Sequence, residues 1–173
     1  MDPQGTVAEE LSDPLAGQRR PVPYLPILIS GALAGALDIT FAFVFYGSRG
    51  SAPTRILQVI ASGVLGRSAF QLGDASAALG AFFHFFIAIS AAAVYYIVSR
   101  RLSLLIRRPF LSGAIFGVAM YVAMHFIVLP LSRVGFHWLP LPAVVGEMFS
   151  HIFLFGMVIA FGISRAQQRP RTT

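Results

Sequence analysis

The sequence predicts an all-α membrane protein, a four-transmembrane-helix bundle with a short interfacial helix between the first and second spans. Three observations predict it. Of the 173 residues, 56% are hydrophobic and only 12% are charged, whereas soluble domains carry about 25% charged residues. The mean hydropathy is +0.73. Four apolar stretches are long enough to cross a bilayer as helices, which takes about 20 residues each.

The four spans are expected over residues 26–46, 75–99, 110–131 and 141–164. The segment between the first two is too polar to cross the membrane. Within it, Pro53 begins a helical pattern. Its apolar side carries Ile56, Leu57, Ile60 and Val64, and its polar side carries Arg55, Gln58 and Ser62. This pattern is typical of a helix that lies in the membrane interface or enters it only partway.

The domain organisation follows from these spans. Residues 24–165 are expected to form one four-helix transmembrane domain. Residues 1–23 are polar and have no hydrophobic periodicity, so they are expected to be a disordered cytoplasmic tail. Residues 166–173 are expected to form a second short cytoplasmic tail.

The basic residues, all of them arginine, predict the orientation. Nine fall on one side of the predicted membrane and four on the other. The nine are Arg19, Arg20, Arg100, Arg101, Arg107, Arg108, Arg165, Arg169 and Arg171; the four are Arg49, Arg55, Arg67 and Arg133. Positively charged loops stay in the cytoplasm, so both termini are expected there. The net charge of +6 therefore reflects topology. It does not predict a nucleic-acid partner, because no basic stripe with interleaved aromatic residues is present.

Five ionisable side chains interrupt the apolar spans: Asp38, His84, His125, Glu147 and His151. Such residues are costly in hydrocarbon unless they are paired, so they are candidates for function. Counted from the span ends at 1.5 Å per residue, all five lie roughly 9–15 Å below the outer surface. We therefore expect one polar layer that converges in an outward-opening cavity.

Glu147 and His151 have the most informative spacing, because residues four apart share a helix face. A carboxylate beside an imidazole can orient the ring and raise its basicity, so we predict a central Glu147–His151 pair. Three interpretations of the layer stay open. It can be structural hydrogen bonding between helices, a proton-responsive cluster, or a site for a metal, a haem or another small ligand. The metal-ligand candidates are His84, His125, His151 and Glu147.

Small residues mark two predicted packing faces. Residues 30–35 and 112–117 each contain Gly-x-x-x-Gly, formed by Gly31 with Gly35 and by Gly113 with Gly117. This spacing allows close approach between membrane helices. Residues 80–84 also resemble 146–151 with one residue inserted. The pattern indicates either an internal repeat, related by an axis along the membrane normal, or chance similarity in sequence rich in Gly, Ala and Phe.

A set of spaced residues in the C-terminal half resembles the YagU-like family of bacterial inner-membrane proteins. The set comprises His125-Phe126, Trp138-Leu139-Pro140 and Glu147 to His151, and the resemblance covers about residues 75–160. It implies that His125, Trp138, Glu147 and His151 are positions marked by the family. It also implies the bacterial inner membrane as location, a dimeric state and a role in acid resistance.

Other chemistry is not indicated. The chain has no cysteine, which excludes disulfides and thiol chemistry, and it contains neither a phosphate-binding loop nor a nucleophile elbow. The leading prediction is a small non-enzymatic membrane protein whose buried cluster responds to protons or binds a small ligand. The alternatives are a metal- or haem-binding membrane subunit and a structural or assembly subunit. The expected partners are the lipid bilayer and either a second copy of the chain or a larger membrane complex.

Overall fold

The computed structural model describes residues 24–136 and 138–168, and this part of the chain is helical without a strand. Four helices are long and apolar enough to cross a membrane. The first span is α2 (Tyr24–Gly47) and the second is α4 (Gly73–Ser99). The third combines α6 (Pro109–Ala123), η2 (Met124–Val128) and α7 (Leu129–Leu131). The fourth combines α8 (Leu141–Phe149), η3 (Ser150–Gly156) and α9 (Met157–Gln168). The predicted all-α four-span bundle is confirmed.

The predicted tails lie almost entirely outside the described residues. This holds for 1–23 and for 169–173. Of the second predicted tail, residues 166–168 continue α9. Four of the nine arginines that predict the orientation also lie outside: Arg19, Arg20, Arg169 and Arg171. The cytoplasmic location of the termini therefore stays a prediction.

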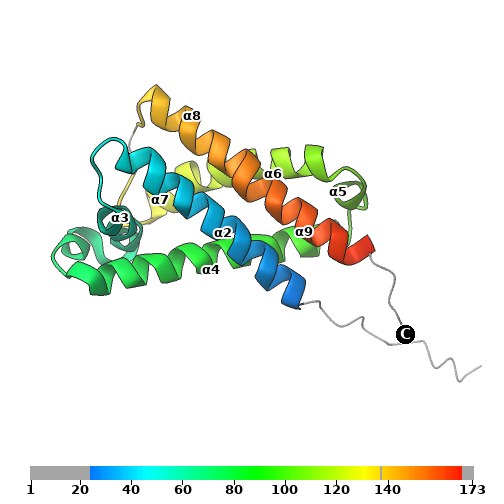
Figure 1. The fold of residues 1–173 in the computed structure, drawn as a ribbon, viewed down its shortest axis with the longest axis horizontal. Coiled ribbons are helices and arrows are strands. Elements are labelled where there is room, and N and C mark those ends of the chain that lie inside the picture. Colours follow the sequence, from blue (N-terminus) through cyan, green and yellow to red (C-terminus); the bar gives the residue numbers. More distant parts are fainter. Residues whose placement is uncertain (1–23, 137, 169–173) are drawn as a thin grey trace, which may run out of the picture.

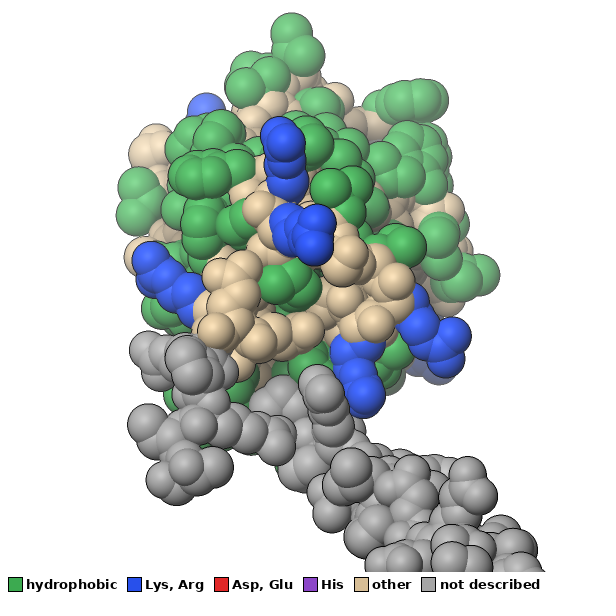
Figure 2. All heavy atoms as spheres, turned by 90° about the vertical axis from the view of Figure 1, so that its right-hand side faces the viewer, with side chains coloured by type: hydrophobic (Ala, Val, Ile, Leu, Met, Phe, Trp, Pro, Cys, Tyr) green, Lys and Arg blue, Asp and Glu red, His purple; other side chains and the backbone are tan. Residues whose placement is uncertain are grey.

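The four spans run side by side along the length of the molecule (Figure 1). At one end lie α3 (Pro53–Leu65), η1 (Gly66–Phe70) and α7, and at the other lie α5 (Leu104–Arg107) and the end of α9. We call the second of these the arginine-rich end. It carries Arg100, Arg101, Arg107, Arg108 and Arg165, and Arg side chains surround it without an Asp or Glu among the described atoms in view (Figure 2).

The short helix α3 begins at Pro53, as the sequence predicts, because proline suits the first turn of a helix. Its buried residues are Gln58, Ala61 and Ser62, whereas Arg55 of the predicted polar side is exposed. Gln58 is buried and donates a hydrogen bond of 3.1 Å to the carbonyl of Gly73, whereas Val59 and Val64 are about half exposed. A helix surrounded by lipid satisfies its polar groups against protein and turns its apolar groups outward, so this orientation fits a membrane.

Glycines allow close packing of the first span against the second and of the third span against the fourth. A Cβ atom at Gly31 would lie 2.6 Å from the Cα of Ile89, so α2 contacts the backbone of α4. A Cβ atom at Gly117 would lie 2.6 Å from the Cα of Ile152, so the third span contacts the backbone of the fourth. Gly35 and Gly113 lie one turn away on the same faces, against Ala88 and Met157 respectively. These contacts are all within one chain.

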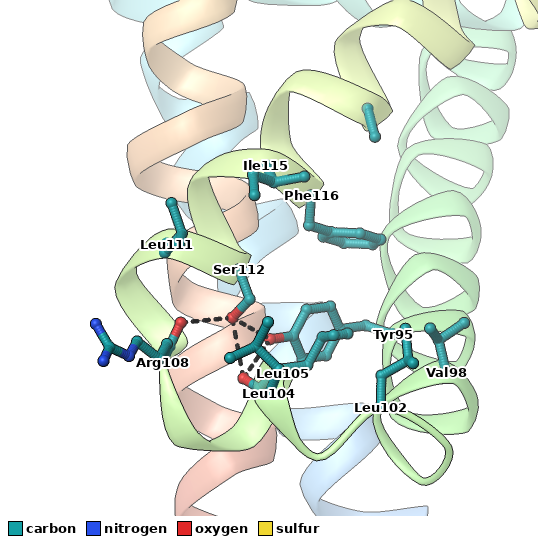
Figure 3. A pocket seen from close by; sticks show the side chains of 11 residues that line it. Tyr95, Val98, Leu102, Leu104, Leu105, Arg108, Leu111, Ser112, Ile115 and Phe116 are labelled. Atoms are coloured by element: carbon teal, nitrogen blue, oxygen red, sulfur yellow. Dashed lines mark hydrogen bonds between the residues drawn. The ribbon is translucent and has the colours of Figure 1, made fainter.

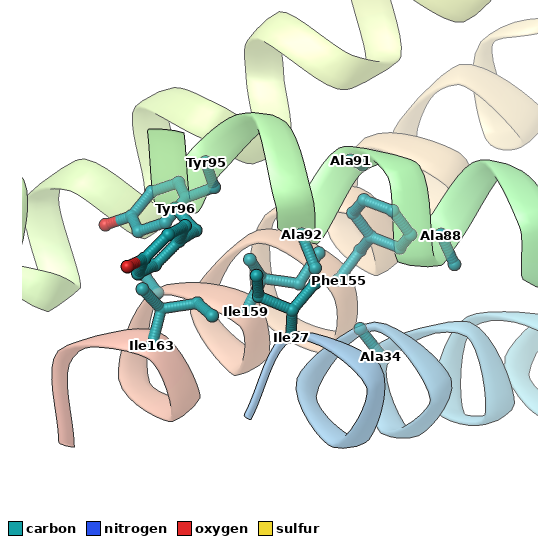
Figure 4. Packing of buried hydrophobic residues seen from close by; sticks show 11 residues of the cluster. Ile27, Ala34, Ala88, Ala91, Ala92, Tyr95, Tyr96, Phe155, Ile159 and Ile163 are labelled. Atoms are coloured by element: carbon teal, nitrogen blue, oxygen red, sulfur yellow. The ribbon is translucent and has the colours of Figure 1, made fainter. Parts of the chain in front are cut away.

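The apolar core occupies the half of the bundle toward the arginine-rich end (Figure 4). It is built from small alanines and a few large side chains: Ile27, Ala34, Ala88, Ala91, Ala92, Tyr95, Tyr96, Phe155, Ile159, Ala160 and Ile163. Alanines such as Ala34 and Ala92, which are fully buried, let the helices pack closely, and Phe155 and Ile159 fill the space between them. The centre of this half of the bundle is therefore filled with apolar side chains.

Candidate functional site

A cavity of about 400 Å³ occupies the other half of the bundle, toward the end that carries α3. Helices from all four spans and α3 contribute to its lining. The five ionisable residues singled out in the sequence all line it: Asp38, His84, His125, Glu147 and His151. They alternate there with apolar side chains such as Ile39, Phe41 and Met124. The cavity is thus amphipathic, as small-molecule sites commonly are.

Glu147 connects three spans. Its Oε2 lies 3.3 Å from Nε2 of His125 on the third span, and its Oε1 accepts a short hydrogen bond from the hydroxyl of Tyr46 on the first. The side chains of His125 and Glu147 are only 11% and 23% exposed. One partly buried carboxylate on the fourth span therefore binds groups from two other spans.

The predicted side-chain pair between Glu147 and His151 is wrong. Nδ1 of His151 donates instead to the backbone carbonyl of Glu147, at 2.8 Å. The spacing of four residues brought the two residues together, but Tyr46 and His125 approach from neighbouring helices and take the two carboxylate oxygens. The imidazole is left with the nearest acceptor on its own helix.

The other two members of the layer have separate partners. Asp38 accepts a hydrogen bond of 2.5 Å from the hydroxyl of Ser150, which is 2% exposed. His84 donates from Nε2 to the carbonyl of Gly35, at 2.8 Å. The five residues therefore line one cavity without forming one hydrogen-bonded cluster: the ion pair between His125 and Glu147 is the one salt bridge among the described residues.

The partners of His125 restrict its protonation. Nδ1 lies 3.3 Å from the carbonyl oxygen of Tyr121, and Nε2 faces the carboxylate of Glu147. A carbonyl and an ionised carboxylate only accept hydrogen bonds, and a neutral imidazole has one N–H, so it can donate to only one of the two. The contacts are satisfied by an imidazolium beside a carboxylate, or by a neutral ring beside a protonated Glu147. Each of these two arrangements carries one proton more than a neutral ring beside an ionised carboxylate.

The ring of Tyr121 packs against two of the cavity histidines, His125 and His151. The ring of Tyr121 stacks on His125 with centroids 4.3 Å apart and meets the ring of His151 edge-on at 5.8 Å. Tyr121 is itself buried. The stacking holds the imidazole plane in place between the third and fourth spans, so its two nitrogens stay directed at their acceptors.

Both histidines lie in π-helical turns, His125 in η2 and His151 in η3. A π-helical turn accommodates one extra residue in a helix and is frequent at functional sites. The segment from Gly146 to His151 in the fourth span has six residues, whereas the similar segment from Gly80 to His84 in the second has five. The π-helical turn η3 begins at Ser150, within this longer segment of the fourth span.

Three residues of the site had no functional signal in the sequence: Tyr46, Tyr121 and Ser150. Tyr46 resembles an aromatic anchor at a span end, and its partner Glu147 is 101 residues away. Ser150 is 112 residues from Asp38. Local patterns carry no information on such pairs. Trp138, in contrast, is 84% exposed and packs on Phe136, with ring centroids 5.0 Å apart.

The predicted metal ligands do not gather around one point. In residues 24–136 and 138–168, no three His, Cys, Asp or Glu side chains are grouped so that they could hold a metal ion. His84, His125, His151 and Glu147 each take a protein partner instead. The metal interpretation therefore receives no geometric support from the described residues.

The fold and the cavity define the class of protein: a multi-pass helical membrane protein of four spans with a polar cavity in one half. No family model, curated protein or solved structure matches the chain. The resemblance to the YagU-like family therefore stays a prediction.

Proposed function

We propose that this chain is a small non-enzymatic membrane protein that responds to protons through its cavity, with His125 and Glu147 as the responding pair. The observation that carries this proposal is the contact set of His125. Its two ring nitrogens face a carbonyl and a carboxylate, so loss of the extra proton leaves acceptors facing each other.

The response would act on helix packing. Imidazole is the side chain whose charge changes between pH 5 and 8. With the proton, Glu147 links the first, third and fourth spans through Tyr46 and His125. Without it, the link to the third span weakens. The charged and titratable groups around the pair are Tyr46 and Asp38 on α2, Arg55 on α3, His84 on α4, Tyr121 on α6 and His151 on η3.

A sensor fits the architecture better than a proton channel. The polar cavity occupies one half of the bundle, and the packed apolar core fills the other half. We further propose that the arginine-rich end faces the cytoplasm of a bacterium, which would open the cavity toward the periplasm. The implied role of YagU-like proteins in acid resistance agrees with a sensor there.

A second candidate function is binding of a small ligand, because the cavity is large and amphipathic. The structural interpretation of the layer is also testable, since every member of it has a protein partner. These interpretations predict different effects of pH on the stability of variants at His125 and Glu147.

The experiment measures thermal unfolding between pH 5 and 8 in phosphatidylcholine nanodiscs, with the fluorescence of Trp138, the single tryptophan, as a second readout. We compare wild type, His125→Gln and Glu147→Gln. Asp74→Asn is the matched control, because Asp74 is an exposed carboxylate at the start of α4. The proposal expects the stability lost in His125→Gln and Glu147→Gln to be larger at pH 6 than at pH 8, with Asp74→Asn unchanged. A loss that is the same at every pH would make the pair structural and overturn the proposal.

A further inference from the structure

A separate apolar groove of about 230 Å³ lies between α4 and α6 at the arginine-rich end (Figure 3). It is unrelated to the polar cavity, which lies in the other half of the bundle. Its walls are large apolar side chains from α4, α5 and α6 and the turn after α4: Val98, Leu102, Leu104, Leu111, Ile115 and Phe116. Leu102, Leu111 and Ile115 are each more than half exposed, so the groove is open along its length.

The floor of the groove has two hydroxyl groups, and both have partners. The hydroxyl of Tyr95 lies 2.9 Å from that of Ser112 and 3.1 Å from the carbonyl oxygen of Leu105. The hydroxyl of Ser112 lies 2.9 Å from the carbonyl oxygens of Leu105 and Arg108. With its polar groups satisfied in this way, the floor is suited to an apolar chain.

The mouth of the groove carries a positive charge. Arg108 stands at the edge of the groove, with its guanidinium directed outward and away from Tyr95 and Leu102 (Figure 3). Arg107 precedes it on the chain, and both are exposed. The acidic residues of the described chain are Asp38, Asp74 and Glu147. Two of these line the polar cavity and the third begins α4 at the far end. Among the described residues no carboxylate competes for Arg108.

We propose that this groove binds an anionic phospholipid, with one acyl chain between α4 and α6 and the phosphate group at Arg108. The surrounding bilayer supplies the ligand, since the four spans place the groove among lipids. Basic residues at the membrane surface attract anionic headgroups, and Arg is well suited to phosphate because its donors form a fork. The apolar walls accept the chain, and the arginine selects the headgroup.

The test uses native mass spectrometry of the detergent-purified protein with phosphatidylglycerol and, separately, phosphatidylcholine of the same acyl chains. Arg108→Gln removes the charge. Ile115→Trp and Val98→Trp fill the groove from α6 and α4, at side chains that are already exposed. Arg133→Gln is the control, an exposed arginine at the opposite end. Circular dichroism and melting temperature verify that each variant is folded.

The proposal expects wild type to prefer phosphatidylglycerol and Arg108→Gln to bind it about fivefold more weakly. Both tryptophan variants should lose the bound phosphatidylglycerol, and Arg133→Gln should retain it. Equal binding of the two lipids by wild type would overturn the choice of headgroup. Wild-type phosphatidylglycerol binding in both tryptophan variants would overturn the placement of the chain. A dimer in wild type that both tryptophan variants abolish would make the groove a subunit interface and overturn the proposal altogether.

Discussion

Nε2 of His125 lies 3.3 Å from Oε2 of Glu147, and this contact joins the third and fourth spans inside the polar cavity. The same carboxylate also accepts a hydrogen bond from Tyr46 on the first span. Within a membrane, groups of this kind stabilise a fold chiefly because leaving any of them without a partner is costly. The carboxylate of Glu147 therefore links three of the four spans at this level.

A double-mutant cycle tests the partner of Glu147. We expect His125→Ala and Glu147→Ala each to lower the free energy of unfolding by about 1–3 kcal/mol, with a coupling between them of about 0.5–3 kcal/mol. The cycle of His151→Ala with Glu147→Ala should show little coupling, because His151 bonds a backbone carbonyl that alanine keeps. The measurement is reversible unfolding in detergent. A larger coupling with His151 than with His125 would contradict the structure.

The two buried serines of the fourth span should behave differently. Both are 2% exposed, but Ser150 donates to Asp38 whereas Ser164 has no hydrogen-bond partner within the described chain. Ser150→Ala should lower stability by about 1–3 kcal/mol, since it leaves a partly buried carboxylate without its donor. Ser164→Ala should be neutral or stabilising. Equal effects in a thermal melt of the two variants would show that the bond to Asp38 contributes nothing.

The glycine contacts predict an order of effects for substitution by alanine. Gly31→Ala and Gly117→Ala should each lower stability by about 1–3 kcal/mol, because the new Cβ meets the backbone of the neighbouring helix. Gly35→Ala should be milder, since it meets only the side chains of Ala88 and Phe85. Gly47→Ala is the control, with no atom within 4 Å of the new Cβ. Melting temperatures in one detergent establish the order, and a loss at Gly47 as large as at Gly117 would refute it.

The orientation is tested by reporter fusions placed after Ser103 and after Ser132. One span separates these positions, since Pro109–Leu131 crosses the membrane between them. We expect the reporter at Ser103 in the cytoplasm, beside the arginine-rich end, and the reporter at Ser132 outside. A paired alkaline phosphatase and green fluorescent protein assay gives opposite signals on the two sides. The same side at both positions would contradict the third span, and the reversed pattern would contradict the orientation alone.

The sequence by itself determined the architecture of this protein. Apolar length predicts four spans within a few residues of their observed bounds, and Pro53 predicts the start of α3. Each of these properties belongs to a continuous segment: its length, its period and the residue at its end. A segment can be judged without its neighbours, so no knowledge of the tertiary structure was needed.

The tertiary structure alone decided which groups meet. The sequence paired Glu147 with His151, which share a helix face, but the carboxylate binds His125 and Tyr46. The sequence also could not show that Gln58 of α3 is buried and that Val59 is exposed. Both results depend on the rotation of one helix relative to another. Periodicity within a segment describes a face of a helix, but only the neighbouring helices decide where that face points.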